Sequence, residues 1–173
     1  MEQIRQMTKS ELCIRLIKKG SAFLIDLYLG SLCATLPVSI YTSIRCSEIS
    51  QNIWQFEKMT GILLSLASFI CLSVYYLLPV LTDRQTIGKR LFRLTVTGER
   101  KNILLRQMAC VIFLATGSQY LSQIISLLSN TNYTEIARNL EEYIAIASVV
   151  FMIFGKKHEM PHDALFKTSV KYE

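Results

Sequence analysis

Charged residues are scarce in this chain, and the scarcity is concentrated in a few places. Only 18% of the 173 residues are Asp, Glu, Lys or Arg, whereas 51% are apolar, which is more apolar than a typical soluble domain. Four stretches have almost no charge: residues 20–44, 60–81, 107–130 and 143–155. With only three prolines and seven glycines, the chain is also unlike a disordered one. The composition favours an integral membrane protein over a soluble enzyme.

Three of these stretches have the length of a membrane span. A helix needs about 20 apolar residues to cross the hydrocarbon core of a bilayer. The fourth run is shorter, so we expect its helix to begin near residue 136, with three charged residues in the headgroup layer: Arg138, Glu141 and Glu142. A re-entrant or interfacial segment is the alternative there. The sequence predicts an all-α membrane protein with four transmembrane helices, at about 20–44, 60–81, 107–130 and 136–155, the fourth being short.

Lys and Arg are distributed unevenly among the segments that connect these spans. Residues 1–19 hold five of them, residues 82–107 hold seven and residues 156–173 hold four, whereas the two remaining connections hold only Arg45, Lys58 and Arg138. Basic residues are enriched in the cytoplasmic loops of membrane proteins. We therefore expect a cytoplasmic segment at 1–19, a membrane domain at 20–171, and both termini in the cytoplasm.

The net charge of +6 does not indicate a nucleic-acid-binding protein. The basic residues lie beside the spans and lack an aromatic binding pattern, so the expected partner is the lipid bilayer with its anionic headgroups. The five cysteines include no CxxC spacing. We expect neither a metal site nor another cofactor, and no nucleic acid among the partners.

Asp26 is the only Asp, Glu, Lys or Arg in the four stretches of low charge, 20–44, 60–81, 107–130 and 143–155. A carboxylate inside a membrane is costly unless it is paired, hydrated or protonated, and such residues commonly belong to functional sites. The alternative is an ion pair that fixes the helix to a basic residue near the membrane surface. Lys19, about two helical turns earlier on the same face, could pair with Asp26. Other candidate partners are Arg84, Lys89 and Arg90.

A short motif, Leu-Phe-basic-x-x-Val, occurs at residues 91–96 and again at 165–170. Both copies follow a predicted span on the side expected to be cytoplasmic, and the residues from 94 onward are rich in β-formers that roughly alternate. We predict that about 91–97 and 167–172 pair as antiparallel strands of a small, hairpin-like cytoplasmic sheet. Because a two-stranded ribbon is marginal in water, this sheet should pack on the ends of the spans.

The segment His158-Glu159-Met160-Pro161-His162 matches the H-E-x-x-H pattern of zinc hydrolases. That chemistry needs both imidazoles on one helix face, and a proline inside the motif opposes it because proline is tolerated only near a helix start. The helix is expected to end here, and no third ligand has an obvious place. We therefore interpret the segment as a polar turn, and we do not expect the protein to be an enzyme.

Three pieces of the chain, in order, resemble the RDD family of multi-pass membrane proteins, which is named for one arginine and two aspartates. They are A-F-L-I-D-L at 22–27, Q-T-I-G-K-R-L at 85–91 and H-D-A-L at 162–165. The family arginine usually stands about seven residues before the first aspartate, where this chain has Lys19. By resemblance, the ligand or ion-pair candidates are Asp26, Lys19, Asp163, His162, Gln85, Gly88, Lys89 and Arg90, with no catalytic residue among them.

The resemblance implies a multi-pass protein of a bacterial cell membrane, for a family in which transport of an unidentified ligand has been suggested. Two hypotheses follow. In the first, the protein transports a small ligand or ion, with Asp26 as the intramembrane carboxylate. In the second, it is a non-catalytic accessory, regulatory or immunity-type subunit, and its partner is another membrane protein or a second copy of itself. Small residues such as Gly30 and Ala34 could support those helix contacts.

Overall fold

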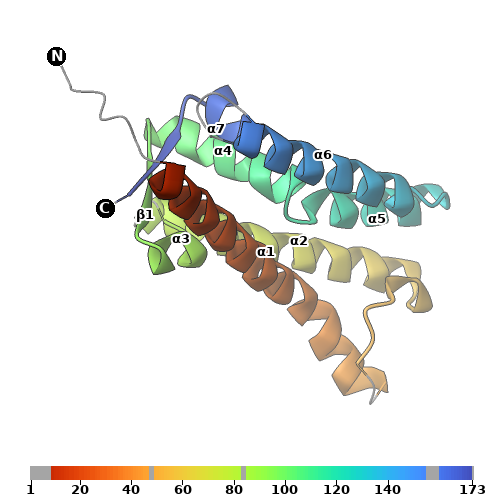
Figure 1. The fold of residues 1–173 in the computed structure, drawn as a ribbon. Helices are drawn as coiled ribbons and strands as arrows, with labels where there is room; N and C mark the ends of the chain where they lie inside the picture. Colours follow the sequence, from red (N-terminus) through yellow and green to blue (C-terminus); the bar gives the residue numbers. More distant parts are fainter. Residues whose placement is uncertain (1–8, 47–48, 83–84, 155–159, 173) are drawn as a thin grey trace.

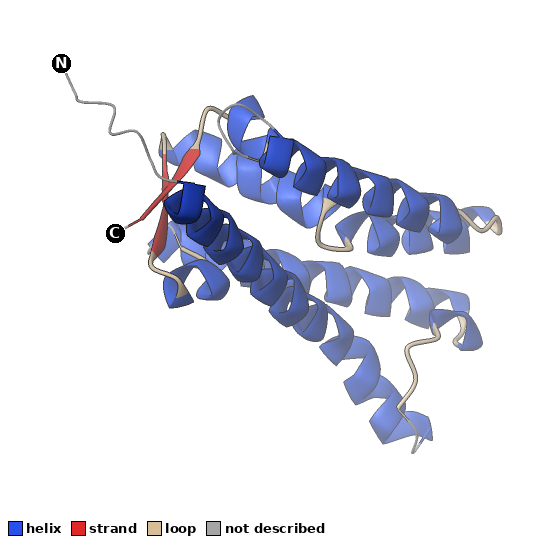
Figure 2. Cartoon of the chain, in the orientation of Figure 1, coloured by secondary structure: helices blue, strands red, loops and turns tan. Residues whose placement is uncertain are grey.

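The computed structural model describes residues 9–46, 49–82, 85–154 and 160–172, which are mainly helical (Figures 1 and 2). The elements are α1 (Lys9–Cys46), the short 3₁₀ helix η1 (Ile53–Gln55), α2 (Lys58–Thr82), α3 (Ile87–Leu91), β1 (Leu94–Thr97), α4 (Arg100–Phe113), α5 (Gly117–Ser129), α6 (Thr134–Phe154), α7 (Pro161–Leu165) and β2 (Ser169–Tyr172). The helical class and the single small sheet agree with the prediction from sequence. Helix α1 begins at Lys9, so the first span continues backward through most of the basic segment expected ahead of it.

Two helices are long and apolar enough to cross a membrane: α1, over Cys13–Arg45, and α2, over Lys58–Thr82. A third crossing is reached if α4 and α5 are counted together, although their axes are bent by 58°. Within the described part of the chain, no other helix meets the same criterion of length and composition. The structure thus supports two or three of the four predicted spans on this criterion.

The predicted span at 107–130 is interrupted where α4 gives way to α5. The amide groups of Leu114 and Ala115 both donate to the Cys110 carbonyl, each at 3.0 Å, which ends α4. Thr116 then adopts a left-handed backbone with φ of 63°. Gly117 follows so close to the preceding turn that a Cβ atom there would lie 2.2 Å from the Val111 carbonyl oxygen. The bend is therefore built into the backbone of these residues.

Helix α6 begins at Thr134, as expected for the fourth helix, and Glu141, which we expected in the headgroup layer, is buried within the protein. Its carboxylate accepts hydrogen bonds from the amide and hydroxyl of Ser118, at 3.1 and 2.5 Å, and from Gln119 Nε2 at 2.6 Å. These groups lie in the first turn of α5, where backbone N–H groups lack helical acceptors. Glu141 thus joins α6 to the start of α5 and satisfies polar groups that the break exposes.

Strands β1 and β2 pair antiparallel, which confirms the predicted pairing. The register places Val96 opposite Val170 at the middle of the ladder, with Thr95 opposite Lys171 and Thr97 opposite Ser169. Figure 1 shows that the sheet, α3, α7 and the first turns of α1 lie at the same end of the helices, which we call the sheet end. The chain therefore leaves the sheet end with α1 and comes back to it with α7 and β2.

The two copies of the Leu-Phe-basic motif have the same local structure. Each consists of a five-residue helix, a capping Phe, one left-handed basic residue and a four-residue strand, which in the second copy begins one residue later, after Thr168. The left-handed residues are Arg93, with φ of 53°, and Lys167, with φ of 52°. Since Val96 and Val170 occupy equivalent places and face each other, the ladder register is symmetric about this pair. The motif is therefore a structural repeat, related by an approximate two-fold axis at the sheet.

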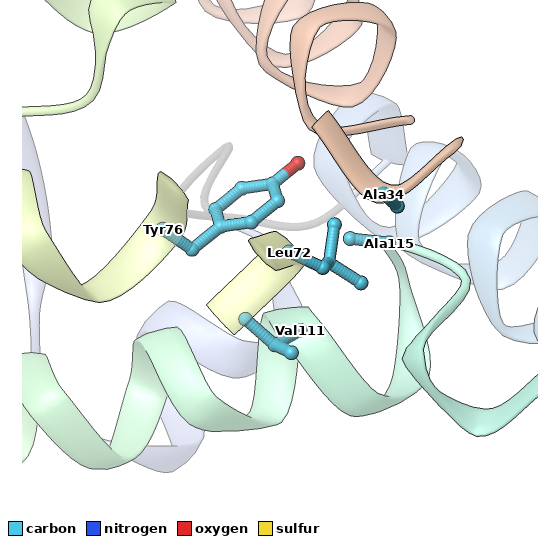
Figure 3. Packing of buried hydrophobic residues seen from close by; sticks show 5 residues of the cluster. All are labelled: Ala34, Leu72, Tyr76, Val111 and Ala115. Atoms are coloured by element: carbon cyan, nitrogen blue, oxygen red, sulfur yellow. The ribbon is translucent and has the colours of Figure 1, made fainter. Parts of the chain in front are cut away.

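The core consists of clusters along the helices. In the central cluster, the Tyr76 and Leu72 side chains of α2 pack with Ala34 of α1 and with Val111 and Ala115 (Figure 3). Near the sheet end, a second cluster joins α2, β1 and α4 through Val80, Val96 and Ile103. This cluster packs the sheet on the helix ends, as a two-stranded ribbon requires.

Candidate functional site

Asp26 lies on α1 near the sheet end with 2% of its surface exposed. Its Oδ1 accepts hydrogen bonds from the Gly88 amide at 2.8 Å and from the Tyr75 hydroxyl at 3.2 Å. Its Oδ2 accepts a hydrogen bond from the Thr86 hydroxyl and lies 3.6 Å from Lys89 Nζ. Among the described residues, the carboxylate is thus surrounded by four donor groups.

The contacts of Asp26 hold α3 against α1. Thr86, Gly88 and Lys89 come from the first turn of α3 or the residue before it, so one carboxylate binds the whole start of that short helix. A five-residue helix has too few internal hydrogen bonds to be stable alone. The approach is close, because a Cβ atom on Gly88 would lie 2.3 Å from the Ala22 carbonyl oxygen. Glycine is therefore required at residue 88 for Asp26 to reach the backbone.

A second buried ion pair lies at the same end of the molecule. Arg106 of α4 donates from Nε to Oδ1 of Asp163, which lies in the first turn of α7, at 2.5 Å. Both side chains are almost fully buried, and Thr168 also donates to Asp163 Oδ1 at 3.3 Å. Arg106 Nη1 donates to the Gln107 side-chain oxygen at 3.1 Å. Because both members are out of water, the pair holds α7 on α4 with strong electrostatics.

The two ion pairs occupy equivalent places in the structural repeat, with opposite sign. Lys89 stands two residues before Leu91 in α3, and Asp163 stands two residues before Leu165 in α7. Lys89 pairs with an aspartate on α1, whereas Asp163 pairs with an arginine on α4. Each short helix is thus held by one ion pair: α3 is held to α1, and α7 is held to α4.

The two pairs line one cavity of about 40 Å³. Its charged lining comes from five residues: Lys19, Asp26, Lys89, Arg106 and Asp163. Tyr76, Gln107, Cys110, Met160 and His162 also contribute to its wall. A cavity needs about 10–15 Å³ to hold one water, so this one admits a few water-sized particles. Charges from α1, α3, α4 and α7 therefore converge on a single small space.

Burial and neighbouring charges shift the pKa values of three residues that line the cavity: Lys89, His162 and Asp163. Burial, followed by the Arg106 guanidinium, lowers the pKa of Lys89, although Asp26 opposes the shift. Burial alone would raise the pKa of Asp163, but the Arg106 guanidinium holds it below its ordinary value. Burial and Arg106 lower the pKa of His162 to about 3, so this imidazole is neutral at pH 7.

The neutrality of His162 predicts a stability loss in mild acid. The unfolded chain takes up a proton at this residue near pH 6.5, whereas the folded chain does not until about pH 3. Since the unfolded state binds more protons between these values, stability present above pH 6.5 falls as the pH drops, by about 2 kcal/mol between pH 7 and pH 5. Asp163, with its lowered pKa, adds a loss only at more acidic pH.

Thermal unfolding of detergent-purified protein at pH 7, 6 and 5 measures this effect, with His162→Gln as the comparison. The variant has no imidazole at residue 162, so its midpoint should fall less over the same range. Parallel curves for the two proteins would show that His162 is not held neutral by the fold.

Of the predicted site residues, the structure brings Asp26, Gly88 and Lys89 into direct contact. Lys19, His162 and Asp163 line the same cavity. Gln85 instead donates to Thr95 at 3.4 Å, and Arg90 is exposed. Of the H-E-x-x-H segment, His158 and Glu159 lie outside the described residues, and Pro161 begins α7, so a helix starts where we expected one to end.

Five further residues complete the site and were not predicted as site residues from the sequence: Thr86, Tyr75, Tyr76, Arg106 and Gln107. Arg106 was counted as one more basic residue at the inner edge of a span, with no sign that it was buried. The repeated motif offered a signal for Arg106. Asp163 occupies the place in the second copy that Lys89 occupies in the first, so a basic partner for Asp163 could be expected on α4, as Lys89 has an acidic partner on α1. Tyr76 donates its hydroxyl to the Asp26 carbonyl at 3.0 Å, a contact that only the packing of α2 on α1 reveals.

Comparison with known proteins supports one assignment. The model of the RDD family matches residues 20–167, which is most of the chain and includes all three resembling pieces. No curated protein and no solved structure matches the chain. The family match covers α1 with Asp26, the start of α3, and α7 with Asp163. This protein belongs to the RDD family.

Proposed function

We propose that the protein transports a small ligand or ion across the cell membrane and binds it in the cavity between Asp26 and Asp163. The observation that carries this proposal is the convergence of three cations and two carboxylates on one small space at the end of apolar helices. Buried charge is costly next to a membrane and is usually retained for ion or substrate pathways.

The same proposal includes a topology of four spans with both ends of the chain in the cytoplasm. The chain leaves the sheet end with α1 and returns to it with β2, which requires an even number of crossings (Figure 1). The basic residues concentrated at that end favour the cytoplasmic side. In this arrangement, α4 and α5 form one broken crossing and α6 the fourth. Broken helices are common where transporters bind their substrates.

The accessory-subunit hypothesis has less support from side-chain packing. Gly30, one of the small residues that could have met a partner helix, lies against the Tyr76 ring of the same chain. Ala34 is fully buried in the central cluster, and Ser118 is bound to Glu141. These small residues therefore serve contacts within the chain, and they leave fewer close-approach sites for another protein.

Flux through proteoliposomes tests the transport proposal. Purified protein is reconstituted, and Na⁺, K⁺, H⁺ and Cl⁻ gradients are followed with pH-sensitive and chloride-sensitive dyes. We expect flux above that of empty vesicles, and we expect Asp26→Asn to reduce it at least about tenfold, because losing one charge-assisted contact costs about 1.5–3 kcal/mol. Glu142→Gln, which neutralises an exposed carboxylate, should keep the wild-type rate.

Two results would contradict the proposal. One is the absence of flux under every gradient, combined with stoichiometric capture of another membrane protein, which would favour the accessory hypothesis. The other is undiminished flux in folded Asp26→Asn protein, which would remove Asp26 from the pathway.

A further inference from the structure

Two buried polar groups in the wall of the cavity have no hydrogen-bond partner among the described residues: Gln107 Nε2 and His162 Nδ1. Gln107 is 1% exposed and His162 is 9% exposed, and both line the cavity of about 40 Å³. They lie on different helices, but each is the chain neighbour of one member of the Arg106–Asp163 ion pair. Because a buried polar group without a partner is costly, the cavity is expected to supply one for both groups.

The hydrogen-bonding pattern of the two groups defines their partner. The Gln107 oxygen accepts from Arg106 Nη1 at 3.1 Å, which fixes the amide orientation and leaves Nε2 as a donor. His162 is neutral at pH 7, since its pKa is about 3, and its Nε2 lies 3.9 Å from the Asp163 carboxylate. A carboxylate beside Nε2 favours the proton on that nitrogen, so Nδ1 is left as an acceptor. The partner must therefore accept from Gln107 and donate to His162.

A water molecule meets this requirement, whereas a simple ion does not. Water donates and accepts at once, a halide only accepts, and a metal cation does neither. The hydrogen bonds alone select water, so the selection does not depend on the charges of Lys19 and Lys89. A buried water typically makes about three hydrogen bonds and needs about 10–15 Å³, so the cavity of about 40 Å³ accommodates it.

We propose that the cavity holds an ordered water that accepts a hydrogen bond from Gln107 Nε2 and donates one to His162 Nδ1. This water joins α4 to α7 beside the Arg106–Asp163 ion pair. Because Gln107 also accepts from Arg106, the bridge helps to hold the guanidinium toward Asp163. The inference goes beyond the proposed function and does not rest on it. A ligand that enters the space between Asp26 and Asp163 must displace this water or bind through it.

Radiolytic footprinting of the purified full-length protein tests the proposal, because hydroxyl radicals formed from a bound water oxidise the side chains next to it. Met160 lines the cavity and is 8% exposed, whereas Met152 is 6% exposed and is not among the lining residues. We expect Met160 to be oxidised to its sulfoxide about tenfold faster than Met152, since bulk solvent reaches both poorly. Equal rates for the two methionines would overturn the proposal and would indicate that Gln107 and His162 bond directly.

Gln107→Leu removes the donor at similar size, and the oxidation rate of Met160 should then fall to that of Met152, because an apolar cavity stays dry. Gln123→Leu, at a glutamine that contacts Ser65 and does not line the cavity, is the matched control. It should keep the wild-type ratio of the two rates. An unchanged ratio in folded Gln107→Leu protein would overturn the proposal, and the wild-type comparison stands by itself if that variant does not fold.

The position of the proton on His162 gives a second, independent measurement. Nitrogen-15 NMR of His158→Gln protein observes a single imidazole, because the chain has only two histidines. At pH 7 we expect the proton on Nε2 and an unprotonated, hydrogen-bonded Nδ1. A proton on Nδ1 would overturn the proposed bridge. Neither measurement depends on transport, so a bridging water in protein that gives no flux would remove only the transport proposal.

Discussion

Arg106→Met is expected to destabilise the folded protein by about 3–5 kcal/mol, because it leaves the Asp163 carboxylate buried without its cation. Arg106 and Asp163 are 3% and 4% exposed at their side chains, and they are joined by a 2.5 Å hydrogen bond. Thr168 alone cannot replace a guanidinium as the partner of a buried carboxylate. The loss should also release α7 from α4, so β2 should lose protection from hydrogen exchange before the helices do.

The matched control for this variant is Arg138→Met. Arg138 lies 3.9 Å from Glu142, but the side chains are 57% and 66% exposed, so water screens the pair. Such surface pairs contribute about 0–1 kcal/mol. Thermal or denaturant unfolding of both variants in the same detergent gives the comparison. Equal losses for the two substitutions would mean that the Arg106–Asp163 pair is not buried in the way we describe.

Gly88→Ala is expected to cost about 3 kcal/mol or more through overpacking against backbone atoms. The added Cβ would lie 2.3 Å from the Ala22 carbonyl oxygen and 2.9 Å from the Asp26 carboxylate. A flexible side chain could move away, but the Ala22 carbonyl belongs to the backbone of α1 and cannot. The start of α3 would have to leave α1, and the amide hydrogen bond to Asp26 would be broken.

Gly20→Ala tests whether the effect is local. Gly20 is also in α1, and an added Cβ there meets nothing within 4 Å. Alanine is the better helix former by about 0.5–1 kcal/mol, so this variant should be as stable as the wild type or slightly more stable. If Gly88→Ala is tolerated as well as Gly20→Ala, the close contact between α3 and α1 is wrong.

From the sequence, Asp26 could be predicted with several candidate partners, whereas of the second ion pair only Asp163 was among the candidates. Asp26 was identifiable because a carboxylate in an otherwise uncharged stretch must be paired, hydrated or protonated, and Lys89 was one of several basic candidates for its partner. Arg106 was not identifiable in this way, because a basic residue at a span edge is ordinary and its burial depends on how α7 folds back onto α4. Hydropathy reports the cost of placing a residue in a membrane, and it does not report which other helix covers it.

The sheet and the helix break illustrate the same contrast. The pairing of β1 with β2 was predictable because a repeated motif indicated two equivalent strands. The bend between α4 and α5 was not, since Thr116 and Gly117 are ordinary residues in a membrane helix and no proline or charge marks the site. The burial of Glu141 within the protein was not predictable for a related reason: its partners on α5 exist only because the break exposes the first turn of that helix.

The departure at Lys19 has a physical consequence in this account. Where the family usually has arginine, this chain has a lysine on the wall of the cavity. Lysine offers a compact charge without the planar fork that binds carboxylates in two places. The wall thus keeps its positive charge, while the fork geometry that could bind a carboxylate is supplied by Arg106, which already uses it on Asp163 and Gln107.

Flux through proteoliposomes that hold either the wild-type protein or Asp26→Asn tests the central claim most directly. The account predicts flux above that of empty vesicles for the wild type, and a loss of at least about tenfold in folded Asp26→Asn protein. Undiminished flux in that variant would contradict the account.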